Sequence, residues 1–384
     1  MAGVDCIDVA ADAAVISSAR EALSVADGLR DAAQARGYDA QGAPWLMVSL
    51  NDGEDPHFRK AEFDAGQCPV DCPRPCETIC PAQAIAFEHD SRNDIDEHRS
   101  GVIDSRCYGC GRCLLVCPFE RITTRSYVSS PTAIASTVLQ GIDAVEIHTQ
   151  VGRLTDFERL WGAIAPHVSQ LQLVAVSCPD GDGLIDYLKS IYQLISPIAC
   201  PVIWQTDGRP MSGDIGDGAT HAAVRLGQKV LAANLPGYVQ LAGGTNRYTV
   251  KKLRALGLLN SKALHHKPTI AQNSSHHPPI ARSPHRENDF TSPHYISGVA
   301  YGSYARALLS PVLEQLEPSH FDPSFNRFND INDLIGDFSS SHPLGQFNPH
   351  LECHPPLLWQ AVELAHSLVS QLKSPKHQEQ VMST

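Results

Sequence analysis

The chain has 384 residues, 12 cysteines and a formal net charge of −12. This length predicts one large domain plus a smaller module, and the acidic balance argues against binding to nucleic acid or to an anionic membrane surface, because like charges repel. The sequence contains no run of about 18 apolar residues that would predict a membrane span, and its N-terminus has no secretory signal. We therefore expect a cytoplasmic protein.

Short apolar runs that favour β-structure recur along the chain, with amphipathic stretches between them. Runs that are apolar on both faces are typical of parallel strands covered by helices. Their spacing of about 30 residues corresponds to one strand plus one helix, which favours an α/β domain with a (β/α) barrel-like architecture over a doubly wound sheet. The expected strands lie at 4–10, 44–50, 143–149, 172–178, 200–206 and 238–244, and a terminal helix is expected at 355–373.

Two segments interrupt this rhythm. Residues 66–127 are rich in cysteine and proline, and their middle reads as two short strands around a polar turn, so we expect an inserted module there. Residues 261–293 carry proline, serine and paired histidines without an apolar period, which is typical of a flexible loop. The barrel-like domain would then comprise 1–65, 128–260 and a last unit with a C-terminal helical region at 294–384.

The downstream cysteine run follows a known metal-binding spacing. In a cytoplasmic protein, clustered cysteines are more often metal ligands than disulfides. Cys107, Cys110, Cys113 and Cys117 are followed by Pro118, which is the spacing of bacterial ferredoxins, where the fourth cysteine ligates the other cluster. The intervening glycines remove side-chain bulk where the backbone must wrap a cluster.

An upstream run supplies the complementary thiols, although with three residues between every pair it departs from the ferredoxin spacing. We predict two [4Fe–4S] clusters that exchange one ligand, in a ferredoxin-like module. One cluster would be held by Cys80, Cys107, Cys110 and Cys113, and the other by Cys68, Cys72, Cys76 and Cys117. A single cluster and two zinc sites with four cysteine ligands each remain alternatives, because zinc also stabilises loop-rich modules.

Other loops that follow expected strands are candidate binding sites, because such loops line the functional face of a barrel. A polar pocket beside the clusters, or a solvated connection, is expected from Asp52, Glu54, Asp55, His57, Arg59 and Lys60. A phosphate, such as that of a flavin, is a candidate ligand of Gly243, Gly244 and Gly302, because glycine N–H groups approach phosphates closely. Calcium is not favoured at 206–218, nor is a metal at His265, His266, His276 and His277.

Several longer segments resemble one family. They are NDGEDPHFRKAEFD, both cysteine runs, DAVEIHT, QLAGGTNRYTVKKLRALGLL and SGVAYGSYARALL. With these segments the chain resembles the light-dependent period proteins of cyanobacteria over most of its length. The resemblance implies an iron–sulfur protein that reports cellular redox state and modulates circadian period. It also implies contacts with clock-input kinases and oscillator proteins, and an additional strand and helix before the segment at Met1.

The favoured function is redox sensing, in which the state of the clusters changes a surface that a signalling partner reads. No nucleophile–base pair is identifiable, so no catalytic residue is assigned. The alternative is a flavin-dependent oxidoreductase whose clusters relay electrons to a barrel active site. Stoichiometric flavin in the purified protein would favour the enzyme, whereas iron and sulfide without flavin would favour the sensor.

Overall fold

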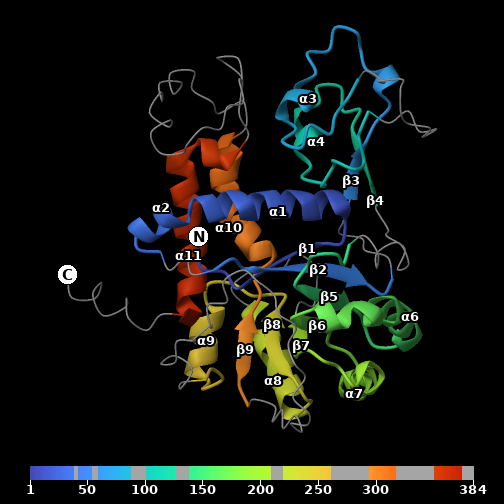
Figure 1. The fold of residues 1–384 in the computed structure, drawn as a ribbon, viewed down its shortest axis with the longest axis vertical. Helices are drawn as coiled ribbons and strands as arrows, with labels where there is room; N and C mark the ends of the chain where they lie inside the picture. Colours follow the sequence, from blue (N-terminus) through green and yellow to red (C-terminus); the bar gives the residue numbers. More distant parts are fainter. Residues whose placement is uncertain are drawn as a thin grey trace, which may run out of the picture. The chain divides into compact units, whose positions relative to one another are not determined.

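The computed structural model describes residues 1–38, 42–53, 59–87, 101–126, 138–208, 219–260, 294–316 and 350–373. The chain divides into two compact units, whose elements are labelled in Figure 1. The first unit comprises Met1–His148, Thr155–Leu171 and Ala305–Ser367, and the second comprises Thr149–Leu154, Gln172–Tyr304 and Leu368–Thr384. Each unit is described by itself.

Three parallel strands organise the first unit. The central strand β2 (Trp45–Asn51) pairs with β1 (Cys6–Ala10) on one side and with β5 (Ala144–His148) on the other. Most of β2 and β5 is buried, which explains why both read as nearly continuous apolar runs. Helix α1 (Ala13–Gly28) follows β1 directly and packs against it, and its N-terminus is capped by the side chain of Asp12.

Four parallel strands organise the second unit, in the order β6 (Leu173–Pro179), β7 (Val202–Asp207), β8 (Tyr238–Ala242) and β9 (Ile296–Val299). The connecting helices are α7 (Leu184–Ile195), α8 (Ala219–Ala232) and α9 (Thr249–Ala255), and α8 packs against β7 and β8. The remaining helices and 3₁₀ turns of the chain are α2 (Arg30–Ala35), η1 (Ala65–Gln67), α6 (Leu154–Ile164), η2 (Ala165–Gln170), α10 (Ser303–Leu313), η4 (Glu314–Leu316), η8 (Leu351–Cys353) and α11 (Pro355–Lys373).

The α/β class with parallel strands is confirmed, and the six strands expected from apolar runs are all present. The terminal helix α11 has the expected bounds. Among the described strands, neither unit forms a closed barrel. In the first unit the end strand β1 pairs with β2, and in the second unit the end strand β9 pairs with β8. No helix of the described ranges has the length and apolarity needed to cross a membrane.

The cysteine-rich segment of the first unit forms a small layer of its own. Strand β3 (Arg59–Glu62) pairs antiparallel with β4 (Thr123–Ser126), so strand pairing begins upstream of residue 66. Between them lie α3 (Pro75–Ile79) and α4 (Arg112–Val116), which contact each other (Figure 1). Where two inner strands are expected, an antiparallel bridge joins Ile85 to Val102. The rest of the expected pair, residues 88–100, lies outside the described part, so that prediction stays open.

The core of this segment is small and contains sulfur. It is built from Ala61, Phe63, Cys76, Ala84, Ile85, Val102, Cys107, Cys113 and Ile122. One buried ion pair ties the segment to α1: the ammonium of Lys60 on β3 lies 2.9 Å from the carboxylate of Asp12 and donates to the carbonyl of Asp104 at 2.7 Å. This ion pair therefore anchors the cysteine-rich segment to the start of α1.

Candidate metal centre

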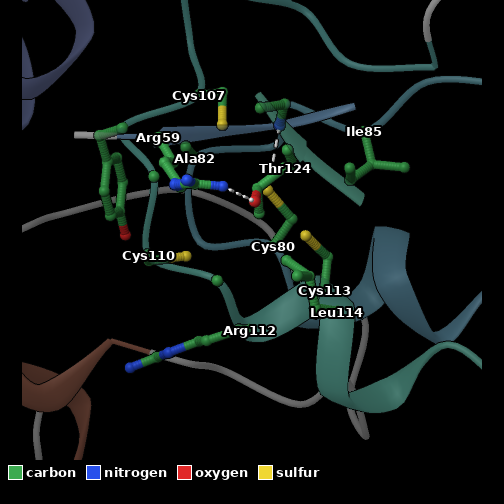
Figure 2. A pocket seen from close by; sticks show the side chains of 15 residues that line it. Arg59, Cys80, Ala82, Ile85, Cys107, Cys110, Arg112, Cys113, Leu114 and Thr124 are labelled. Carbon is green, nitrogen blue, oxygen red and sulfur yellow. Dashed lines mark hydrogen bonds between the residues drawn. The ribbon is translucent and has the colours of Figure 1, made fainter. Parts of the chain in front are cut away.

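Four thiols line one pocket of the cysteine-rich segment (Figure 2). Cys80 follows α3, Cys107 and Cys110 precede α4, and Cys113 lies in the first turn of α4. Much of the remaining wall is apolar and is formed by Ala61, Ala82, Ala84, Ile85 and Leu114. The pocket thus unites three cysteines of the downstream run with one of the upstream run, which is the combination that the sequence predicts for one cluster.

The other four cysteines also gather. Burial raises the pKa of Cys68, and a hydrogen bond with Cys72 and the charges of Cys72 and Cys117 raise it further. Burial raises the pKa of Cys76 to about 11, and the charges of Cys117 and Cys68 contribute in the same direction, against a hydrogen bond from the backbone of Glu77. Electrostatic coupling of this kind requires proximity, so this set takes three cysteines from the upstream run and one from the downstream run.

The two halves repeat one local design. Cys76 and Cys113 are each the second residue of a five-residue helix, and Cys80 and Cys117 each follow directly after that helix. Each of the latter is followed by a proline and, three residues on, by a residue with positive φ. These are Gln83 (φ 48°) and Glu120 (φ 51°). A non-glycine residue rarely adopts this conformation, so its occurrence at matching positions marks a repeated turn.

The repeated turn brings backbone N–H groups to sulfur. The amide of Ala84 donates to Sγ of Cys80 at 3.2 Å, and the amide of Arg121 donates to Sγ of Cys117 at 3.4 Å. Burial raises the pKa of Cys117, but hydrogen bonds from the backbones of Arg121, Phe119 and their neighbours outweigh it, so the net pKa is lowered. Donors aimed at sulfur stabilise the thiolate, which is the form that binds metal.

In the pocket of Figure 2, burial opposes the ionisation of Cys110 and Cys113. Burial raises the pKa of Cys113 to about 12, and the charges of Cys110, Cys107 and Cys80 add to the rise. Four thiols that share an apolar pocket cannot all ionise without compensation, because like charges repel and burial disfavours charge. A cationic metal core provides that compensation, and its binding releases the protons.

Iron–sulfur cores and zinc ions place different demands on a set of thiols. In the described part of the chain, no three histidine, cysteine or carboxylate side chains converge closely enough to hold a single metal ion. A zinc ion needs its sulfurs about 2.3 Å from one point, whereas a [4Fe–4S] core holds each thiolate on a different iron and therefore needs a wider ring. Four thiols around an apolar pocket are a donor set that fits an iron–sulfur core.

Two domain families and one curated relative match this chain. The LdpA Fe–S cluster-binding domain matches residues 68–128, and the Light dependent period A C-terminal domain matches residues 137–371. A protein of Synechococcus elongatus named Light dependent period A is 40% identical over 374 residues, which is 97% of this chain and 84% of the relative. The chain belongs to the light dependent period A family. No solved structure matches it.

In this member of the light dependent period A family, the described residues of the expected polar pocket lie in different surroundings. Lys60 is buried in its ion pair with Asp12, Asp52 is buried, and Arg59 lines the thiol pocket and donates to Thr124 at 3.3 Å. The other predicted members, Glu54, Asp55 and His57, lie outside the described residues. Of the expected pocket, therefore, Lys60 anchors the segment to Asp12 and Arg59 forms part of the wall of the thiol pocket; both lie on β3.

The Gly-Gly-Thr-Asn sequence after β8 forms a packed turn. Gly243 and Gly244 have positive φ, and a Cβ at Gly244 would lie 2.9 Å from the carbonyl oxygen of Ala219. Asn246 accepts a hydrogen bond from Thr220 and donates its backbone N–H to Thr249. This buried network explains the motif by packing, and a flavin phosphate finds no support here. No atom lies within 4 Å of a Cβ built at Gly302, and the loop histidines and residues 209–218 lie outside the described part.

A polar cluster on β1, β2 and β5 was missed at the level of sequence. Ser49 donates to the carboxylate of Asp8 at 2.6 Å, and His148 lies 3.0 Å from Glu146. The surrounding protein removes part of the solvation of the Asp8 carboxylate, and this effect, followed by the charge of Glu146, raises its pKa to about 8. The side chain still keeps contact with solvent. Strand pairing aligns these positions on one face of the sheet. The signal available in the sequence was the presence of polar residues inside these apolar runs: Asp8 in β1, Ser49 in β2, and Glu146 and His148 in β5.

Proposed function

We propose that this chain is an iron–sulfur redox sensor with two [4Fe–4S] clusters, acting in the cytoplasm as a light or redox input that modulates a circadian clock. The observation that carries the proposal is the exchange of cysteines between the two runs. The pocket thiols include Cys80 of the upstream run, whereas the set around Cys68 includes Cys117 of the downstream run. Reciprocal sharing of this kind is the arrangement of two-cluster ferredoxins.

The order of elements supports a ferredoxin-like module. Along the chain, β3, α3, the residue Ile85, the residue Val102, α4 and β4 follow one another, with β3 paired to β4 and Ile85 bridged to Val102, both antiparallel. A strand–helix–strand repeated twice is typical of ferredoxin-like units. The matching conformations at Cys80 and Cys117 are consistent with such a repeat.

When bound, each cluster supplies one-electron redox chemistry at a potential set by its surroundings. The residues of this chain would hold it with four thiolates, exclude water with apolar side chains, and stabilise thiolate charge with backbone donors at Cys80 and Cys117. Gain or loss of an electron changes the charge of the module by one unit. A partner that contacts the module would sense this change electrostatically.

Membership of the family supports the signalling role. The relative bears the name Light dependent period A, which associates that protein with light and with a period. We accordingly propose clock-input kinases and oscillator proteins as partners of this chain. An electron carrier without signalling partners would bind none of them, and this difference is measurable.

Double alanine variants test the cluster assignment. Under ligand exchange, replacing Cys80 and Cys113 removes ligands of the same cluster, so one cluster's worth of iron and sulfide is retained. If each run held its own cluster, the same pair would damage both. The complementary pair, Cys76 and Cys80, should lose both clusters under exchange and only one otherwise. Replacing Cys200, which lies outside both runs, is the matched control and should retain all iron.

Redox-dependent binding tests the sensor. Anaerobic protein, oxidised or reduced with dithionite, is passed over an immobilised clock-input kinase, and a several-fold difference in Kd between the two states is expected. The Cys80→Ala/Cys113→Ala variant should show a smaller difference. Equal affinity in both states would reject redox sensing but not the presence of clusters. Protein that contains no iron would reject the whole proposal.

A further inference from the structure

The two halves of the cysteine-rich segment differ at one matched position. The residue before Cys113 is Arg112, whereas the residue before Cys76 is Pro75. The halves otherwise repeat the same helix, the same turn and the same contact of a backbone N–H with sulfur. At this position, therefore, the downstream half has a cation and the upstream half has none. Arg112 is also one of the residues that line the pocket of Cys80, Cys107, Cys110 and Cys113.

One nitrogen of the Arg112 guanidinium lacks a hydrogen bond, while the charge of the side chain also acts on His350. This nitrogen, Nη1, is buried and, among the residues that the structure describes, has no hydrogen-bond partner. Figure 2 shows the side chain leading away from Cys110 and Cys113 in this view, so its influence on sulfur is exerted through space. A buried cation without a partner is costly unless a nearby anion offsets its charge. The thiol pocket is where such an anion would form.

Arg112 adjoins two of the pocket thiols. Its backbone N–H donates to Cys110, and it directly precedes Cys113 in the first turn of α4. A charge on this residue therefore lies close to the pocket that would hold the cluster. Arg74, the cation inside the upstream run, also acts on its own thiol set through Cys68. Unlike Arg112, however, it is exposed and lies over the ring of Phe87 at 4.2 Å, so solvent screens its charge more strongly.

We propose that Arg112 selectively stabilises the reduced state of the cluster held by Cys80, Cys107, Cys110 and Cys113, and so raises the reduction potential of that cluster alone. The inference rests on the proposed function, because it requires the two clusters. A thiolate-ligated cluster is anionic and gains one further negative charge on reduction, so a fixed cation nearby favours the reduced form. No bond forms or breaks, and one electron is taken from an external reductant such as dithionite.

Redox titration of the intact chain, followed by electron paramagnetic resonance, tests this role. Arg112→Met should shift the reduction equilibrium of one cluster at least tenfold toward oxidation, which is about 59 mV for one electron. The other cluster should stay at its original potential. The Cys80→Ala/Cys113→Ala background, which retains the other cluster alone, identifies the affected one: there Arg112→Met should have no effect.

Two further variants separate charge from packing. Arg112→Lys retains the charge and should restore most of the potential, whereas Arg112→Gln should behave like Arg112→Met. Arg106, an exposed arginine that donates to the carbonyl of Gln83, is the matched control, and Arg106→Met should shift neither cluster tenfold. If Arg112→Met loses iron, the reduction potentials of Arg112→Lys and Arg112→Gln are compared instead. Equal potentials in those two variants, with two clusters present, overturn the inference, whereas absence of clusters in the wild type overturns the proposed function instead.

Discussion

Replacement of Lys60 by methionine should destabilise the protein far more than the loss of an ordinary surface charge. Only 2% of the Lys60 side chain and 3% of the Asp12 side chain are exposed, and their charged atoms lie 2.9 Å apart. The ammonium also donates to the carbonyl of Asp104. Methionine keeps the length of the side chain and removes the charge, so the carboxylate of Asp12 is left buried without its cation.

The magnitude follows from that burial. Breaking a buried pair by removing one partner costs about 3–5 kcal/mol, because the remaining charge is uncompensated. Asp12 keeps its hydrogen bonds from the backbones of Ala14 and Val15 at the start of α1, which partly stabilise its charge. We therefore expect about 3 kcal/mol for Lys60→Met. At a urea dependence of about 1–3 kcal/mol per molar, the unfolding midpoint should fall by about 1–3 M.

A double-mutant cycle isolates the pair. Asp12→Asn retains a helix cap but removes the anion that lies 2.9 Å from the ammonium, so it should also cost about 3 kcal/mol. The double variant removes both charges of the pair and should cost about as much as either single change. Urea unfolding followed by circular dichroism gives the values, and Arg159→Met, which breaks the exposed pair with Asp156, is a control expected to cost at most about 1 kcal/mol. Additive single effects, or a Lys60 loss no larger than that of Arg159, would refute the reasoning.

The remaining predictions concern strands and turns. Because the pKa of Asp8 is raised from 3.8 to about 8, the folded protein holds a proton there that the unfolded chain has lost, so stability falls as pH rises between about 4 and 8. Asp8→Asn should flatten this slope in unfolding midpoints measured across that range, and an unchanged slope would count against it. Gly244→Ala should cost about 2–3 kcal/mol, because φ is +72° and the new Cβ would lie 2.9 Å from the carbonyl of Ala219. Gly257→Ala, with φ of +66° and no atom within 4 Å, should cost about 1 kcal/mol, and equal losses would show that backbone strain alone matters.

The parts of the fold that sequence predicts are those where one physical requirement dominates a short window. A parallel strand covered on both sides must be apolar at successive positions, so the run at β6 could be recognised without knowledge of its neighbours. The cysteine motif could also be recognised locally, because Cys107, Cys110 and Cys113 have the spacing typical of ferredoxin ligands. Barrel closure was harder to predict, because it depends on tilt and stagger summed over all strands.

Features that depend on long-range pairing escaped the sequence. A loop with the composition of Asn51–Lys60 is normally solvated, so nothing local distinguishes Lys60, which is buried against Asp12, from an exposed lysine. The Gly-Gly-Thr-Asn turn posed the converse problem. Glycine near a strand end serves phosphate binding and tight packing alike, and only the position of Ala219 against Gly244 favours packing.

Under the proposed exchange of ligands, the module is a cooperative unit. Cys80 ends α3 but faces the thiols that precede α4, and Cys117 ends α4 but acts on the thiols of the upstream run. Neither proposed ring of four sulfurs would exist until both halves have folded against each other, so cluster binding would stabilise the contact of α3 with α4 as well as each loop. In that arrangement, oxidative loss of one cluster would remove a cross-link between the halves and weaken the site of the other. A partner that reads the shape of this module would then register the loss of a cluster as a change in structure, in addition to the change in charge that accompanies electron transfer.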